Sequence, residues 1–114
     1  MSHERKLLTE AYRDFNARRL DAVLARMKID VVWPNGMEGG CVYGHEGVRD
    51  YWTRQWSILD PSVEPLRIES DESGRYVVEV HQVVRDLAGV LLSDAIVRHA
   101  YRISDGLIER MDIE

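Results

Sequence analysis

YVVEVHQVVRDLAGVLLSDAIVRHAYRISDGLIERMDI, residues 76–113, is the stretch of sequence that decides the fold class. It contains three runs rich in β-branched residues, over residues 76–86, 90–103 and 107–113, and this composition is typical of strands. Short turns that contain glycine, such as Ser104-Asp105-Gly106, join the runs. Strands joined by short turns pair in antiparallel fashion, so this half of the chain predicts an antiparallel sheet.

The first half of the chain has helical periodicity instead. Between Glu4 and Arg19 the apolar residues recur at the spacing of one helix face, and charged residues occupy the opposite face. The pattern continues to Met27 after a break near Arg18-Arg19, and two tryptophans of residues 45–59 lie four positions apart. We therefore predict helices over residues 4–19, 20–27 and 45–59.

The remaining segments connect these helices to the final hairpins. Residues 29–33 form a β-branched run, which stops at a proline and an Asn-Gly pair. We therefore expect a strand there. Residues 35–44 hold four glycines and are expected to form a loop, while residues 63–70 predict a strand after Asp60-Pro61 ends the third helix. Helices followed by hairpins are typical of an α+β domain, which we expect to span residues 1–114 as one unit.

The charge and the cysteine content exclude several classes of function. The 114 residues carry a net charge of −5, whereas nucleic-acid binding needs a basic face. No apolar run approaches the length of a membrane span. Cys41 is the one cysteine, which is typical of a protein of the reducing cytoplasm. Cys41 and His45 alone provide too few ligands for a metal site. The glycines of residues 36–40 lack the surroundings of a phosphate-binding loop, so we expect neither a metal nor a cofactor.

Four segments together carry a resemblance to a known superfamily: AYRDFNARRLDAVLARM (residues 11–27), DVVWP (30–34), YGHEGVRDYW (43–52) and AYRISDGLIERMDIE (100–114). In this order they resemble the NTF2-like superfamily, which includes SnoaL-like polyketide cyclases, ketosteroid isomerase and limonene epoxide hydrolase. The chain looks like a bacterial SnoaL-like member, and the resemblance covers nearly all of it. It implies a cone-shaped α+β fold in which three N-terminal helices pack on a curved antiparallel sheet and enclose a pocket.

The positions that carry chemistry in two of these enzymes hold other residues in this chain. Ketosteroid isomerase has its carboxylate base directly before the proline that ends the first strand, where this chain has Trp33. Its first-helix tyrosine falls on Ala11 or Tyr12, with Ala11 in the better register, and its strand acid falls on His99. The arginine and aspartate of limonene epoxide hydrolase fall on an uncharged valine and a glutamine. We therefore expect neither of those two reactions.

The resemblance also implies which side chains face the pocket. Strand alternation places His99 and Tyr101 on one face of the sheet, and in the superfamily that face lines the cavity. We expect Trp33 to form a wall and Asn35 a polar group at the rim, around a small metabolite that is apolar or of mixed polarity. The other residues that we expect to line the pocket are Tyr12, Trp52, Trp56, Val80, Gln82, Val97 and Met111.

Structural roles also explain these residues, and these alternatives stay open. Tryptophans at helical spacing, such as Trp52 and Trp56, are typical of a core, and Asn35-Gly36 is by itself a turn signal. His81 and Arg85 have the opposite parity from Gln82 along their strand, so their side chains point to the other face of the sheet. In the superfamily that outer face commonly packs against a second subunit, so the resemblance implies a homodimer through the outer face of the sheet.

Two classes of function fit this pocket, and the sequence leaves open whether the chain is an enzyme. An isomerase, cyclase or dehydratase would use His99 as its acid or base, because an imidazole has a reference pKa of about 6.5. A non-catalytic binding module would use the same pocket, and the absence of the mapped catalytic carboxylates favours it. A structural dimer whose cavity is filled by the tryptophans is the third alternative.

Overall fold

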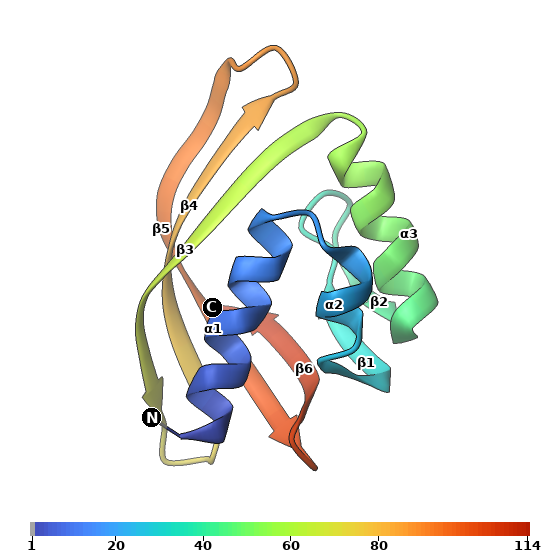
Figure 1. Cartoon of the computed structure of the whole chain (residues 1–114). Coiled ribbons are helices and arrows are strands. Elements are labelled where there is room, and N and C mark those ends of the chain that lie inside the picture. The colour runs from blue at the N-terminus through green and yellow to red at the C-terminus, as the bar shows by residue number, and fades with distance from the viewer. Residues whose placement is uncertain (1) are drawn as a thin grey trace.

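The computed structural model describes residues 2–114, and Met1, the first residue of the predicted domain, lies outside the described residues. Its main feature is a curved six-stranded sheet that does not close, with the helices packed on one side of it (Figure 1). This is the predicted cone-shaped α+β fold. In chain order the elements are α1 (His3–Asn16), α2 (Leu20–Leu24), β1 (Met27–Pro34), β2 (Cys41–Tyr43), α3 (Gly44–Trp56), β3 (Leu59–Ser70), β4 (Tyr76–Asp86), β5 (Leu91–Ser104) and β6 (Leu107–Ile113).

The strand order β2-β1-β6-β5-β4-β3 places the first strand next to the last one. The hairpins from β3 to β6 are antiparallel, as predicted. In contrast, β1 and β6 run parallel, with Met27 opposite Ile108 and Val32 opposite Arg110. The sheet is therefore antiparallel except at one pair of strands, and this pair joins the helical half of the chain to the hairpins.

The helices bury one face each against the sheet. Leu8 of α1 and Val48 of α3 are fully buried, and Leu24 of α2 is nearly so. At the end of α1 the Asn16 side chain donates to the Val63 carbonyl at 2.7 Å and accepts from the Val63 amide at 2.9 Å, which attaches α1 to β3.

None of the helices within residues 2–114 is long and apolar enough to cross a membrane.

A buried ion pair joins α1 to the segment between α2 and β1. Asp14 is 2% exposed, and its Oδ2 accepts from the Arg26 Nε at 3.1 Å and from the Arg26 Nη2 at 3.0 Å. Glu10 adds a second carboxylate 2.8 Å from the same guanidinium. Because a buried carboxylate is stable only with such partners, these contacts fix where the chain leaves the helices and enters β1.

Two of the predicted boundaries at the start of the sheet were wrong. Met27, which was assigned to the second helix, is the first residue of β1 and is buried opposite Ile108. Residues 41–43, within the predicted loop, form β2 and pair with the end of β1. In both cases the pairing partner decides the conformation, and for Met27 its helical spacing does not reveal that partner.

The end of the third helix was also predicted too late. α3 ends at Trp56, and Leu59 begins β3, which continues through Asp60-Pro61 and Pro65. A proline cannot donate a hydrogen bond, so within sheets it is confined to edge strands, strand starts and bulges. β3 is the edge strand, and its register shifts between Pro65 and Arg67, which explains how it accommodates both prolines.

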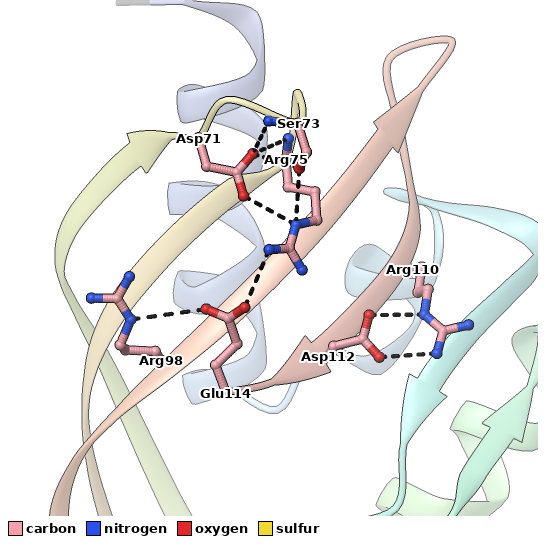
Figure 2. Close-up of polar contacts among 7 residues, drawn as sticks. All are labelled: Asp71, Ser73, Arg75, Arg98, Arg110, Asp112 and Glu114. Atoms are coloured by element: carbon pink, nitrogen blue, oxygen red, sulfur yellow. Dashed lines mark hydrogen bonds and ion pairs between the residues drawn. The ribbon is translucent and has the colours of Figure 1, made fainter.

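Polar contacts on the outer face of the sheet hold the end of β6 in place, as Figure 2 shows. The Glu114 carboxylate lies 3.3 Å from Arg75 and 3.9 Å from Arg98, and the Glu114 amide donates to the Arg98 carbonyl at 2.9 Å. In the turn before β4, the hydrogen bond from the Ser73 hydroxyl lowers the pKa of Asp71 to about 2, and Asp71 in turn accepts from Arg75. These contacts matter for the site because the inner side of β6 lines the cavity.

Candidate functional site

A cavity of about 290 Å³ lies between the curved sheet and the helices. This volume is at the lower bound of small-molecule pockets, which span about 300–1,000 Å³. All three helices and five of the strands, β1, β3, β4, β5 and β6, contribute to its wall. None of the described residues that line it carries a charged side chain. The cavity therefore suits a compact ligand without a formal charge.

The structure brings most of the predicted pocket residues together around this cavity. Trp33 comes from the first strand, Gln82 from β4, His99 from β5 and Met111 from β6, while the helices lie across from them. In α1 the neighbours Ala11 and Tyr12 both line the cavity, so both registers considered for the first-helix tyrosine reach it. The predicted residues in the cavity wall are Tyr12, Trp33, Trp52, Gln82, His99, Tyr101 and Met111.

Three other predicted residues pack beside the cavity and do not line it. Val80 is fully buried within the hydrophobic core, and Val97, opposite it on β5, is half-buried against that core. Trp56 stacks on Trp52 with 5.7 Å between ring centroids, and the Arg18 guanidinium lies 5.1 Å from its ring. For the two valines the curvature of the sheet explains this difference, because alternation predicts the face of a residue but not its distance from the cavity.

Asn35 also lies away from the cavity wall, because its side chain closes its own turn. Its Oδ1 accepts from the amides of Met37 at 3.1 Å and Glu38 at 2.9 Å. Its Nδ2 donates to the Glu38 Oε1, which also accepts from Arg54 at 2.6 Å. Its neighbours Gly36 and Met37 reach the cavity instead. The turn signal in Asn35-Gly36 thus describes the structure better than the expected polar group at the rim.

Aromatic rings form the largest continuous part of the cavity wall. The ring of Trp52 lies 5.4 Å from that of Trp33 and 5.0 Å from that of Phe15, both in edge-to-face contact. Trp33 is 6.1 Å from Tyr101, so the wall continues from α3 across β1 to β5. Edge-to-face pairs at these distances are favourable and hold the rings in defined orientations. Trp33 is therefore both a wall of the cavity and part of an aromatic cluster.

The polar end of the cavity is a chain of three hydrogen-bonded side chains. Tyr101 Oη donates to Tyr12 Oη at 2.7 Å, and Tyr12 Oη lies 2.8 Å from His99 Nδ1. All three side chains are buried, with 3%, 5% and 6% exposure respectively. Burial lowers the pKa of His99 to about 4 and raises the pKa of both tyrosines. At neutral pH the group is therefore uncharged.

The residues 8–111 match the SnoaL-like domain family. This chain belongs to that family. None of the curated proteins matches the sequence of this SnoaL-like domain.

Solved structures agree with this assignment. An NTF2-like protein of unknown function from Burkholderia pseudomallei is 27% identical, with a TM-score of 0.85 over 100% of this chain and 91% of that one. TerC, co-crystallised with polyporic acid, is 25% identical, with a TM-score of 0.85 over 99% and 91% of the two chains. A Mycobacterium tuberculosis protein in complex with estradiol-17beta-hemisuccinate shares the fold at 20% identity, with a TM-score of 0.84 over 99% and 93%.

Two polar residues of the SnoaL-like cavity, Tyr51 and Gln55, were missed by sequence reasoning. Tyr51 of α3 lines the cavity, and its Oη accepts from the Gly36 amide at 3.0 Å and from the Gln55 side chain at 3.3 Å. Burial raises the pKa of Tyr51, so it keeps its proton. The available signal was its position directly before Trp52, four residues before Gln55, on the side of α3 that turns toward the sheet.

The described residues offer no metal centre. Among residues 2–114 there is no group of three or more histidine, cysteine, aspartate or glutamate side chains that could hold a metal ion. The groups that the cavity offers to a ligand are aromatic faces, aliphatic side chains, two glutamines and the hydroxyl and imidazole groups of the polar end. This arrangement can bind and orient an organic molecule through shape and hydrogen bonds.

Proposed function

We propose that this SnoaL-like domain is a cytoplasmic protein that binds a small, uncharged and largely apolar organic molecule in its cavity. The observation that carries the proposal is the cavity itself, which has an aromatic wall, one polar end and no charged side chain among its described lining residues. Ligand sites in proteins usually combine mostly apolar walls with a few placed polar groups. A buried wall without charge also makes a charged ligand costly to desolvate.

Two structural relatives support binding of this kind. TerC was co-crystallised with polyporic acid, and the more distant Mycobacterium tuberculosis protein was solved in complex with a steroid derivative. Both share the fold over nearly the whole of this chain. These relatives support an organic ligand for the fold, and the choice of an uncharged, compact ligand rests on the cavity of this chain.

An enzyme that transfers protons through His99 is the second candidate function. One observation favours it: His99 lies at the polar end of the cavity, where a ligand would meet it. Its pKa, lowered by burial to about 4, makes it a weak base at neutral pH. No carboxylate among the described residues lies in the cavity wall to assist it. Binding without proton transfer is therefore the function that the geometry supports better.

The proposed binding is tested with Trp33→Ala and the neutral bicyclic ketone 1-tetralone. We expect the wild-type protein to bind 1-tetralone and Trp33→Ala to bind it about 10-fold more weakly, because the variant loses an aromatic face of the wall. Isothermal titration calorimetry measures both affinities. The control is Ile58→Ala, since Ile58 is exposed after α3 and does not line the cavity. Equal affinities of folded Trp33→Ala and wild type would contradict binding in this cavity.

We also propose that the outer face of the sheet forms a homodimer. Ile96 and Leu92 of β5 are 57% and 55% exposed, and His81 and Asp94 form a 2.7 Å hydrogen bond beside them. The same face carries Arg98, so apolar groups and charges of both signs lie together, as an interface between identical surfaces requires.

The dimer is tested by sedimentation at several protein concentrations. We expect the wild-type protein to sediment as a dimer and Ile96→Arg as a monomer, because the added charge would be buried without a partner. Ile58→Arg is the matched control, since it places the same charge at an equally exposed isoleucine that follows α3. A dimer in both variants, or a monomeric wild type, would be evidence against this interface.

A further inference from the structure

We propose that Tyr12 is a positioning residue that fixes His99 in the tautomer with its proton on Nε2. The polar end of the cavity then presents a hydrogen-bond donor and selects uncharged ligands that carry an acceptor oxygen, such as ketones and quinones. This inference rests on the proposed ligand-binding function and names the chemical class of the ligand. It also assigns a role to the tyrosine pair, which the sequence predicted only as part of the pocket lining.

Tyr101 decides which group donates in each hydrogen bond of this chain of three side chains. Its hydroxyl is buried, and among the described residues its one hydrogen-bond partner is Tyr12 Oη. If Tyr12 donated to Tyr101, the proton of Tyr101 would be buried without an acceptor, which costs about 1–3 kcal/mol. Tyr101 therefore donates its proton across the 2.7 Å between the two hydroxyl oxygens, and Tyr12 accepts it.

The same reasoning then determines the tautomer of His99. Tyr12 has accepted a proton from Tyr101, so its own proton needs an acceptor, and its other partner is His99 Nδ1 at 2.8 Å. A neutral imidazole carries one proton, and a ring nitrogen that accepts a hydrogen bond cannot also hold it. The proton of His99 therefore lies on Nε2, which has no hydrogen-bond partner among the described residues. Nε2 is not one of the buried side-chain atoms that lack a partner, so a molecule in the cavity can accept from it. The low pKa of His99 agrees with a neutral ring.

A second donor faces the cavity from the helix side. Tyr51 Oη accepts from the Gly36 amide and from Gln55, and no described residue accepts its proton. The hydroxyl can therefore donate to a ligand while it holds residues 36–37 in place. Donors on α3 and β5 suit a ligand with acceptor oxygens, such as a ketone or quinone. A carboxylate would also accept, but no cationic side chain of the described wall would balance its charge.

The tautomer is tested first, in the protein without ligand. Long-range 1H–15N spectra of the imidazoles report which nitrogen of His99 carries the proton. We expect Nε2 in the wild type and a mixture of tautomers in Tyr12→Phe, which has no hydroxyl to donate to Nδ1. Tyr101→Phe is the matched control and should keep the wild-type tautomer, because Tyr12 still donates. A proton on Nδ1 in the wild type, or an unchanged tautomer in Tyr12→Phe, would overturn the assignment of Tyr12.

The ligand class is tested by calorimetry with three probes of similar shape: 1-tetralone, tetralin and 1,2,3,4-tetrahydro-1-naphthoate. We expect the ketone to bind about 3–10-fold more tightly than the hydrocarbon, because tetralin leaves the Nε2–H without an acceptor. The carboxylate should bind weakest of the three. In His99→Leu, which has no N–H, the preference for the ketone should fall, and what remains would come from the Tyr51 hydroxyl.

The outcomes separate this inference from the proposed function. Equal binding of 1-tetralone and tetralin, or tightest binding of the carboxylate, would overturn the donor assignment while a ligand-binding cavity stands. A ketone preference that is undiminished in His99→Leu would likewise overturn it. Binding of none of the three probes would count against the proposed function and, with it, against this inference.

Discussion

Replacing Trp52 with alanine is expected to lower the free energy of unfolding by about 3–5 kcal/mol, the usual loss for a buried tryptophan. Trp52 is 2% exposed and touches Trp33, Phe15 and Trp56, so its removal takes one aromatic contact from each of these three rings. The cavity lies directly beside it, and the loss would enlarge a space that the surrounding chain cannot fill. Urea denaturation of the wild type and the variant measures the difference.

Trp52→Phe is the matched control for this prediction. It keeps an aromatic ring within the cluster, so we expect it to lose clearly less stability than Trp52→Ala. A loss below about 1 kcal/mol in Trp52→Ala would mean that the helices collapse into the vacated space. That outcome would show that the cavity wall deforms easily, whereas a preformed ligand site keeps its shape.

The second large effect is a loss of stability in acid that depends on His99. Burial lowers the pKa of folded His99 to about 4, whereas an unfolded histidine has a pKa of about 6.5. Between these values the unfolded chain binds a proton that the folded protein does not, so unfolding becomes easier as the pH falls. The contribution is fully present above pH 6.5 and is lost by about pH 4, and it amounts to about 3 kcal/mol.

Carboxylates also titrate near the lower end of this window, so the measurement compares two proteins. Urea denaturation of the wild type and of His99→Leu at pH 7.5, 6, 5 and 4 gives two curves of stability against pH. The wild type should lose about 3 kcal/mol more than the variant over this range. Parallel curves would mean that the folded protein accommodates a charged His99 and that the polar end of the cavity admits water.

Sequence patterns located the hairpins well because each depends on neighbouring residues. β4 and β6 begin and end where alternation and the Gly106 turn place them, and the β5 boundaries differ from the prediction by one residue at each end. The helices were located by their apolar face, and the order of elements identified the family fold. Boundaries failed at Met27, at residues 41–43 and at Leu59, where pairing with another strand rather than a local preference decides the conformation.

The candidate site shows the same division. Strand parity and family resemblance named His99, Tyr101 and Trp33, and the structure places all of them in the cavity wall. Parity could not separate Val80 from Gln82, because both point to the same side and only the curvature of the sheet decides which one reaches the cavity. Tyr51 was missed because its contact with the residue 36–37 turn joins two elements that the sequence does not relate.

By itself, the sequence determined the α+β class, the three helices, the hairpins and an uncharged set of inward-facing side chains. These follow from periodicity and turn chemistry, which act over a few residues. The tertiary structure alone decided that β1 lies parallel to β6 and that Tyr12 and Tyr101 meet His99 in one hydrogen-bonded chain. The reason is physical: such contacts join residues about eighty to ninety positions apart, and their geometry exists only after the sheet has curved around the helices.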